Sequence, residues 1–331
     1  MKAVRFHAFG GPEVLRVEEV ARPEPGPGEA RVAVRAVALN HLDLWVRRGL
    51  PGIALPHVGG SDFAGLVDAL GPGVSGLAPG DRVLGHPLLP PAAPGGEPRI
   101  LGEHVDGACC EALVLPAANL LPVPPRLSFE QAAALPVAFV TAWQMLAERA
   151  RLAPGETLLV QGAGSGVGTA AVQIGRLLGA RVIACTSSEA KQRGVGELGA
   201  DEVIDYRHER ISRRVRELTG GRGADVVFEH VGAATFEQSV LAAARRGRIV
   251  TCGATTGRSV RLPLAFVFAR ELSILGVTLG PIGSLRRVLE HVEAGRLAPV
   301  IDRVLPLEAC REGHEILEAG LQFGKVVLRV G

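Results

Sequence analysis

The second half of the chain alternates between short apolar runs, rich in β-branched residues, and longer segments whose apolar residues recur at helical spacing. The apolar runs predict strands at 157–160, 181–185, 202–204, 225–229, 248–252 and 272–279. The segments between them predict helices at 169–179, 190–198, 211–218 and 236–244. This βαβα alternation is typical of an open, doubly wound parallel sheet with helices on both faces, and therefore of an α/β fold.

The first part of the chain has a different pattern. Short strand-like segments at 14–20, 30–38 and 112–115 are separated by turn-rich stretches, which predicts a compact and mostly antiparallel β domain. Residues 86–107 contain many prolines without periodicity and are expected to form a loop or lobe. After a capping-box pair at Ser128 and Gln131, the chain is expected to cross to the next domain. The end of the chain, 298–331, returns to strand-like segments around a helix at 307–319.

Composition limits the functional class. A chain of 331 residues is long enough for two domains, and 36 basic against 34 acidic residues give a net charge of only +2. We see no basic run with interleaved aromatic residues, so no nucleic-acid partner is expected. No apolar segment has the length of a signal peptide or a membrane span. The five cysteines show no C-x-x-C spacing, so we expect reduced thiols in a cytoplasmic protein without a membrane partner.

One stretch organises the second half: TLLVQGAGSGVG, residues 157–168. It predicts a strand, a glycine-rich turn and the start of a helix, where unpaired backbone N–H groups and the helix dipole favour a pyrophosphate. The spacing departs from G-x-G-x-x-G, because Ala163 and Ser165 take the first and third positions when Gly168 is last. A glycine-rich connection that binds nothing is the alternative. The βαβ context favours a dinucleotide site, which we assign to Gly164, Ser165, Gly166 and Val167.

The end of the second strand indicates which dinucleotide is bound. NAD-selective sites place a carboxylate there, whereas this chain has Thr186, Ser187 and Ser188, followed by Lys191. Short hydroxyl side chains leave room for a 2′-phosphate that the lysine could reach. The chain contains 33 arginines and only three lysines, which favours a specific role for Lys191 over that of a solvated helix residue. Glu189 could instead take the carboxylate role, so NADPH is expected and NADH stays open.

Several motifs together resemble one family. These are NHLDLWVRRG at 40–49, LPHVGGSDFAGLVDALGPGV at 55–74, GDRV at 80–83, TAW at 141–143, the glycine-rich turn, and FGKVVL at 323–328. The chain resembles the medium-chain dehydrogenase/reductase superfamily, on its quinone oxidoreductase and zinc alcohol dehydrogenase-like side. The resemblance implies a mostly β, GroES-like catalytic domain from 1–125 and 281–331, with a Rossmann domain at 126–280. It also implies an active cleft between them and a homodimer joined through the Rossmann sheet edge.

The same resemblance implies further cofactor contacts. Tyr206 stands where NADPH-dependent quinone reductases have an aromatic side chain near the phosphate. The positions expected to line the ribose and nicotinamide are Thr141, Val231, Cys252 and Gly253. Lys325 and His41 match positions that approach the pyrophosphate. For each of these residues, packing at a strand end is the alternative role.

The resemblance also raises the question of a metal. Zinc-type relatives have a cysteine where this chain has Asn40, a His-Glu pair at Ser61 and Asp62, and a thiol or carboxylate near Val137. Zinc sites need about three protein ligands, which these residues do not supply. The four clustered cysteines of a structural zinc lobe are also missing. We therefore expect no zinc, and a site built from the loop histidines His57, His86 and His104 is the remaining alternative.

These observations lead to a reaction class. Without a Lewis acid, hydride transfer is easiest to a conjugated acceptor, a quinone or an α,β-unsaturated carbonyl, whose oxygen takes up charge that hydrogen bonds stabilise. Asn40 is the first candidate for such a donor. Asp43 is expected either to orient the neighbouring loop or to cap a short helix. The alternatives are an alcohol dehydrogenase that uses NAD(P), with an atypical zinc or none, and a protein that binds NADPH without turnover.

Overall fold

The computed structural model describes residues 1–93 and 95–331, which divide into two compact units. Unit 1 comprises Met1–Val137 and Pro299–Gly331, and unit 2 comprises Ala138–Ala298. The first boundary between the units lies about twelve residues later than the sequence suggested, and the second lies about eighteen residues later. Residues 126–137 stay with unit 1 because helix α2, Phe129–Ala133, packs on its sheet. Ala298 stays with unit 2 because its N–H bonds the side chain of Gln173.

Unit 1 is the expected, mostly antiparallel β domain. Its larger sheet has seven strands in the order β10-β6-β5-β3-β18-β17, with β9 also on β3, and a three-stranded sheet has the order β2-β1-β4. The strands are β1 Lys2–Phe6, β2 Arg16–Glu19, β3 Glu29–Ala38, β4 His57–Val58, β5 Asp62–Leu70, β6 Arg82–Gly85, β7 Leu88–Leu89, β8 Arg99–Ile100, β9 Ala112–Pro116, β10 Leu120–Pro122, β17 Ile301–Pro306 and β18 Lys325–Arg329. Its other α-helices are α1 His41–Gly49 and α10 Cys310–Glu318.

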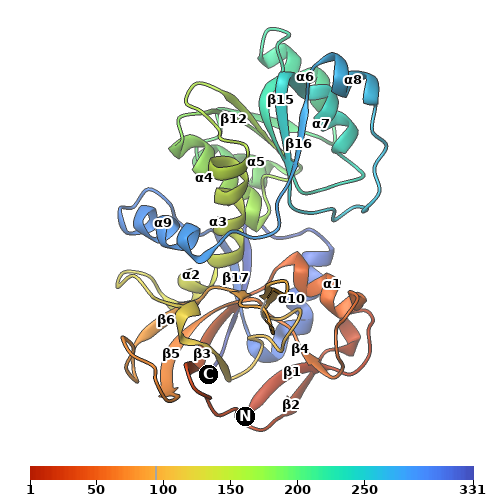
Figure 1. The fold of residues 1–331 in the computed structure, drawn as a ribbon. Helices are drawn as coiled ribbons and strands as arrows, with labels where there is room; N and C mark the ends of the chain where they lie inside the picture. The colour runs from red at the N-terminus through yellow and green to blue at the C-terminus, as the bar shows by residue number, and fades with distance from the viewer. Residues whose placement is uncertain (94) are drawn as a thin grey trace. The chain divides into compact units, whose positions relative to one another are not determined.

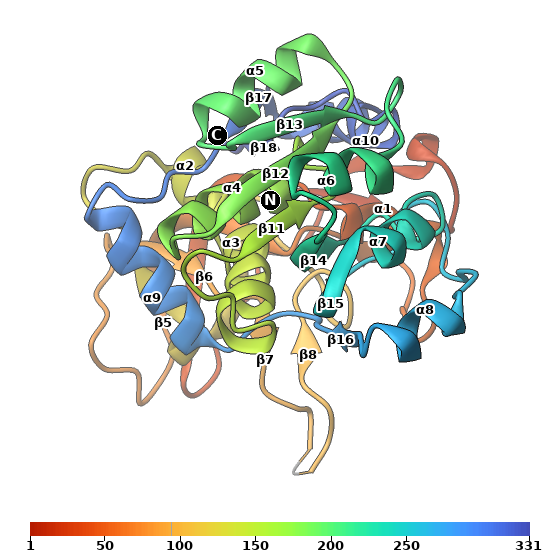
Figure 2. The same ribbon diagram turned by 90° about the horizontal axis from the view of Figure 1, so that it is seen from above.

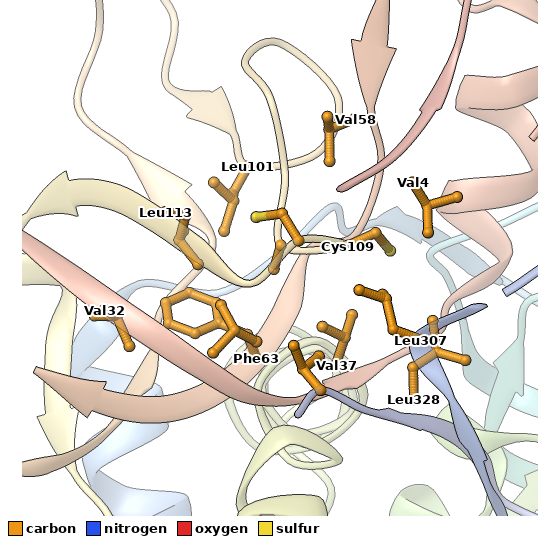
Figure 3. Close-up of a cluster of buried hydrophobic side chains, with 14 of the residues drawn as sticks. Val4, Val32, Val37, Val58, Phe63, Leu101, Cys109, Leu113, Leu307 and Leu328 are labelled. Carbon is orange, nitrogen blue, oxygen red and sulfur yellow. The ribbon is translucent and has the colours of Figure 1, made fainter. Parts of the chain in front are cut away.

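Both ends of the chain build the core of unit 1. Strand β18, from the C-terminal end, pairs antiparallel with β3. Figure 3 shows Leu307 and Leu328 of the C-terminal segment among Val4, Val37 and Phe63 from the first part of the chain. Alternation along β3 places every second side chain in this core, which is why its sequence ARVAVRAVA predicts a strand with one buried face. Unit 1 is therefore a mostly antiparallel β domain built from both ends of the chain.

Unit 2 holds a six-stranded sheet in the order β13-β12-β11-β14-β15-β16, with every pair parallel. Strand β11 is buried along its whole length and β12 along all but its first residue, as expected for parallel strands covered on both faces. Figure 2 shows the six strands side by side in this order, and Figure 1 shows β12, β15 and β16 of the same sheet. The strands are β11 Thr157–Val160, β12 Arg181–Thr186, β13 Glu202–Asp205, β14 Ala224–Glu229, β15 Ala243–Thr251 and β16 Ser273–Gly276. The doubly wound sheet is confirmed.

Two helices of unit 2, α4 and α5, begin at a serine that caps them. Ser165 caps α4 by accepting the Gly168 N–H, and Ser188 caps α5 by accepting the Lys191 N–H. Helix α4 packs on β11 and β12, and α7 packs on β14 and β15. The helices are α3 Pro136–Trp143, which contains the unit boundary, π-helical Gln144–Arg149, α4 Gly166–Leu177, α5 Glu189–Glu197, α6 Ile211–Leu218, α7 Phe236–Ala242, α8 Leu264–Ala269 and α9 Ile282–Glu293.

Some elements differ from the sequence prediction. The segment 86–107 contains a small antiparallel hairpin, β7 with β8, where only a loop was expected. The strand expected at 272–279 is limited to Ser273–Gly276, and helices α8 and α9 were not expected. Helix α8 reads LAFVFA, which has no polar face and therefore gives no helical periodicity. None of the helices in the described part of the chain is long and apolar enough to cross a membrane.

Candidate dinucleotide site and a buried polar cluster

The glycine-rich turn of unit 2 joins β11 to α4 as the sequence predicts. Gly162 has φ +56°, a conformation that suits glycine, and the N–H of Ala163 donates to the Cys185 carbonyl of β12 at 2.9 Å. Ser165 Oγ accepts the Gly168 N–H at 3.0 Å, which leaves the preceding N–H groups of the first turn of α4 for a ligand. Gly166 and Val167 occupy that first turn, so a phosphate placed there would meet the positive end of the helix.

One of the glycines is required by close approach, and a second lies close to two side chains. A Cβ on Gly168 would lie 2.4 Å from the Gly162 carbonyl oxygen, so this glycine lets the turn pack against its own helix. A Cβ on Gly164 would lie 3.1 Å from Cδ of Lys191 and 3.3 Å from Oγ1 of Thr186. The structure therefore brings Gly164, Thr186 and Lys191 together, although they come from three different segments. This cradle of small residues and one lysine fits the phosphates of a dinucleotide.

The end of β12 carries hydroxyl side chains and no carboxylate. Thr186 is the buried last residue of the strand, and Ser187 and Ser188 follow it into α5, whose exposed first residue is Glu189. Tyr206 follows β13 and is 49% exposed. Next to it is Arg207, a cation that sequence reasoning missed. Its guanidinium binds the Asp205 carboxylate at 2.7 and 3.0 Å and holds the pKa of that carboxyl below its usual range.

The carboxyl ends of β15 and β16 and the turn that follows β14 line a cavity of about 600 Å³. Cys252 and Gly253 line it, together with Gly232, Arg258 and Thr278. Burial and, to a smaller extent, the neighbouring Glu229 raise the pKa of the Cys252 thiol to about 12, so this cysteine stays protonated. Ligands of open parallel sheets bind at this edge.

A buried carboxylate that the sequence did not single out orders the turn beside this cavity. Glu229 is fully buried at the end of β14, and its oxygens accept the N–H groups of Val231 and Gly232 at 2.7 and 3.0 Å. The hydroxyls of Thr235 and Ser239 also donate to it. Val231 therefore lies on a turn that the Glu229 carboxylate holds in place by hydrogen bonds. The other expected contact of unit 2, Thr141, is a buried residue of α3.

A second group of polar residues lies inside unit 1, and strand register explains it. Val327 of β18 lies opposite Ala38 of β3, so Lys325 falls opposite Asn40, two positions further on in each direction. Ala38 is also opposite Asp62, the first residue of β5. Residues far apart in the sequence therefore meet at one end of β3. We call Asn40, Asp62 and Lys325 the lysine cluster.

The lysine cluster is closely hydrogen-bonded. Lys325 Nζ donates to Asn40 Oδ1 at 2.5 Å and to Asp62 Oδ2 at 3.1 Å. Asn40 Nδ2 donates to Asp62 Oδ2 at 3.0 Å and to the Ala38 carbonyl at 3.3 Å. The other oxygen of Asp62 accepts the Val137 N–H at 2.8 Å. Only 5% of the Lys325 side chain and none of the Asp62 side chain is exposed, so the ion pair is almost fully desolvated.

Asp43 supports the cluster from the first turn of α1. Its carboxylate accepts the Asn40 N–H at 2.7 Å and the Gly60 N–H at 3.0 Å, so it both caps the helix and ties it to the loop before β5. Burial raises the pKa of Asp43 above its usual value. Both structural roles considered from the sequence are therefore present. His41, the first residue of α1, is only partly buried.

The donor set of unit 1 does not fit zinc. The Asn40 oxygen and both Asp62 oxygens already accept hydrogen bonds, and the Lys325 ammonium stands against them. Ser61 contributes a hydroxyl, which is a poor zinc ligand, and Val137 contributes only its backbone N–H to Asp62. The histidines named as an alternative do not assemble either: in residues 1–93 and 95–331 no three His, Cys, Asp or Glu side chains are grouped to hold a metal ion.

These two sites belong to a recognisable class of protein, in which a GroES-like β unit is combined with a doubly wound dinucleotide-binding unit. Residues 26–125 match the family model of the alcohol dehydrogenase GroES-like domain, and residues 166–294 match that of the zinc-binding dehydrogenases. The chain belongs to the medium-chain dehydrogenase/reductase superfamily and is an NAD(P)H-dependent oxidoreductase.

Individual relatives differ in what they are called. A quinone oxidoreductase of Pseudomonas aeruginosa is 35% identical over 339 residues, covering 99% of each chain. A solved structure of an NAD-dependent alcohol dehydrogenase is 51% identical with a TM-score of 0.96, covering all of both chains. A mycobacterial protein solved in complex with NADPH is 29% identical with a TM-score of 0.88, covering 99% of this chain and all of that one.

Proposed function

We propose that this protein transfers a hydride from NADPH to a quinone or an α,β-unsaturated carbonyl, without a metal. The observation that carries this proposal is the lysine cluster, in which the oxygens at the position of the zinc ligands already accept four hydrogen bonds, two of them from an internal ammonium. For a saturated ketone or an alcohol, a Lewis acid at this point would contribute several kcal/mol to the stabilisation of the transition state. A conjugated acceptor delocalises the incoming charge and needs only hydrogen-bond donors.

The residues of unit 2 would hold the cofactor, which supplies the hydride when bound. The first-turn N–H groups at Gly166 and Val167 receive the pyrophosphate, and Gly164 and Ser165 keep the approach free of Cβ atoms or cap the helix. The wall for the nicotinamide end is formed by Cys252 and Gly253, which line the cavity of about 600 Å³, together with Val231. Thr141 and His41 remain proposed minor contacts.

NADPH is proposed over NADH on the chemistry of the β12 end. The side chains at this end are the uncharged hydroxyls of Thr186, Ser187 and Ser188, which do not repel a phosphate. The aliphatic part of Lys191 lies beside Gly164, in the same cradle. Tyr206 is exposed on the adjoining turn, where its ring can stack on the adenine end of a ligand. The NADPH complex of the mycobacterial relative supports this assignment, whereas the name of the NAD-dependent relative supports NADH.

One observation favours a second candidate, an NAD(P)-dependent alcohol dehydrogenase. The structure that is 51% identical carries that name, at a higher identity than the quinone oxidoreductase of Pseudomonas aeruginosa. The two candidates differ in substrate and metal. Chelator-washed protein should therefore be assayed with NADPH and NADH against quinones, enals, saturated ketones and primary alcohols. Faster turnover of alcohols than of any quinone or enone would replace the first candidate with the second.

We also propose that the protein is a homodimer joined at the edge of the parallel sheet. Strand β16 is an edge strand, so its outer backbone groups are available for pairing. Next to it, α8 is entirely apolar, with Leu264 63% and Phe268 75% exposed, and Ile274 of β16 is 40% exposed. Such a contiguous apolar edge is typical of a subunit interface.

A further inference from the structure

We propose that His230 is a positioning residue of the dinucleotide site, whose imidazole holds the glycine-rich turn in the shape that receives a pyrophosphate. This inference rests on the placement of the cofactor in the proposed function. His230 directly follows β14, and nothing in the sequence singled it out. The residue is only 8% exposed, so its ring acts from inside unit 2, through the backbone of the turn.

The first argument is a hydrogen bond from the ring to the start of the turn. His230 Nε2 lies 2.9 Å from the carbonyl oxygen of Gln161, the residue between β11 and Gly162. A carbonyl oxygen only accepts, so Nε2 carries the ring proton and donates it. Burial lowers the pKa of His230, against a smaller opposing effect of Glu229, so the ring is neutral and this N–H is its single donor.

The second argument is that the turn is held on both sides of β11, whose neighbours in the sheet are β12 and β14. On the β12 side, the Ala163 N–H donates to the Cys185 carbonyl at 2.9 Å. On the β14 side, the Gln161 N–H donates to the Phe228 carbonyl at 3.0 Å. Beyond that bond, the His230 ring connects the chain to the β14 side by donating to the Gln161 carbonyl. Removing the ring would therefore leave the turn held mainly from one side.

The third argument is the fit between the ring and Gly162. A Cβ on Gly162 would lie 2.9 Å from both Cε1 and Nε2 of His230, so the ring occupies the space that a side chain at this position would need. Phe228 packs against the ring edge-on, with 5.9 Å between the ring centroids. The φ of +56° at Gly162 also suits glycine. The turn and the histidine are therefore matched in shape as well as in hydrogen bonding.

The ring also reaches the cap of α4. Its Nε2 lies 3.4 Å from Ser165 Oγ, so the same N–H is shared between the Gln161 carbonyl and this hydroxyl. Ser165 Oγ accepts the Gly168 N–H at 3.0 Å and so fixes the first turn of the helix. The N–H groups of Gly166 and Val167 in that turn are the ones proposed to receive the pyrophosphate. The ring therefore sets the position of these donors without contacting the ligand.

The test compares a variant that keeps a donor with one that removes it. His230→Leu leaves a buried carbonyl without its donor, so it should weaken NADPH and NADH alike by roughly 5-fold to 50-fold, whereas His230→Gln, which offers an amide N–H, should stay within about threefold of wild type. Fluorescence titration gives these dissociation constants. Because the ring does not contact the reacting atoms, kcat at saturating cofactor should stay within about twofold.

Three results would overturn the proposal: unchanged affinity in His230→Leu, a loss for NADPH alone, and equal losses in the leucine and glutamine variants. The last would show that the ring only fills space. His7→Leu, at an exposed histidine of unit 1 paired with Glu18, is the matched control and should bind both cofactors as wild type does.

A double-variant cycle tests the contact with Gly162 even if His230→Leu folds poorly. Gly162→Ala adds a methyl group that meets the ring, together with backbone strain from the positive φ. In His230→Ala the strain is the same, but the methyl group has room. Gly162→Ala should therefore cost at least about threefold less cofactor affinity in that background than in wild type. Equal costs in the two backgrounds would overturn the proposal. Thermal unfolding without cofactor verifies that folded variants are compared.

The result is separable from the fate of the proposed function, because it is measured by binding and not by turnover of an acceptor. If the wild-type protein binds neither NADPH nor NADH, the proposed cofactor site fails, and this inference fails with it. If the wild-type protein binds them and His230→Leu binds them equally well, only the assignment of His230 fails.

Discussion

Lys191 Cδ lies 3.1 Å from the position that a Cβ on Gly164 would occupy, so the only lysine of unit 2 packs against the glycine-rich turn. The N–H of Lys191 donates to Ser188 Oγ, the cap of α5, which fixes where the side chain starts. We propose that this lysine contacts the phosphate group that NADPH carries and NADH lacks.

Lys191→Ala should therefore weaken NADPH binding and leave NADH binding nearly unchanged. A charge-assisted contact of this kind is worth about 1.5 to 3 kcal/mol, which corresponds to a loss of roughly tenfold or more. Dissociation constants for both cofactors, measured by fluorescence titration, test this. Equal losses for the two cofactors would show that Lys191 does not meet the 2′-phosphate. Arg193→Ala, two residues further along α5, is the matched control for a loss of general positive charge.

Gly168→Ala should disrupt the dinucleotide site without touching a ligand. The added Cβ would lie 2.4 Å from the Gly162 oxygen and 2.8 Å from Ala163 Cα, and both neighbours are backbone. We expect a loss of about 1 to 3 kcal/mol in the free energy of unfolding, with weaker binding of NADPH and NADH alike. Gly196→Ala, in α5 with nothing within 4 Å of the new methyl group, should instead stabilise the protein by about 0.5 to 1 kcal/mol. Thermal unfolding of both variants measures the contrast.

Sequence reasoning located the first four strands of the parallel sheet to within one residue, because buried strands and amphipathic helices leave strong local patterns, whereas β15 begins five residues earlier than expected. The turn around Gly162 was found by the same local signal. The lysine cluster could not be found in this way, since it depends on the register of three strands that are far apart in the chain. Asn40 and Lys325 were both singled out, but nothing in the sequence indicated that they contact each other. Glu229 and Arg207 were missed because a single acidic or basic residue at a strand end has no distinctive pattern.

Metal removal should leave activity intact. In this structure Asp62 is paired with Lys325 and hydrogen-bonded to Val137, so a divalent cation would have to displace an internal ammonium to bind there. We expect chelator-washed protein to keep full NADPH-dependent quinone or enone reduction and to take up less than stoichiometric zinc when it is dialysed against the metal. About one tightly held zinc per chain in washed protein, measured by elemental analysis, would contradict this.

Phe268→Glu should convert the proposed dimer to a monomer. Phe268 is 75% exposed on α8, near the edge strand β16, and a buried carboxylate at an apolar interface is strongly disfavoured. Ile274→Lys on β16 should have the same effect. Leu321→Glu, at a leucine that is 64% exposed in unit 1, is the control and should leave the mass unchanged. Light scattering after size exclusion gives the mass, and an unchanged dimer in both edge variants would place the interface elsewhere.

Asn40→Leu should lower kcat with little effect on NADPH affinity. Its amide oxygen accepts a hydrogen bond from Lys325 Nζ at 2.5 Å and its amide nitrogen donates to Asp62 at 3.0 Å, so leucine removes both bonds and disrupts the lysine cluster at the position where relatives hold zinc. We expect a loss of about 10-fold to 1,000-fold in kcat. The loss should be larger for acceptors of weak conjugation than for quinones, because a quinone spreads the incoming charge over its own ring and depends less on a positioned donor. Steady-state kinetics with a quinone, an enal and a saturated ketone give this ranking. An equal loss for all three acceptors would mean that the cluster acts on folding or cofactor placement, and not on the charge that develops at the acceptor oxygen.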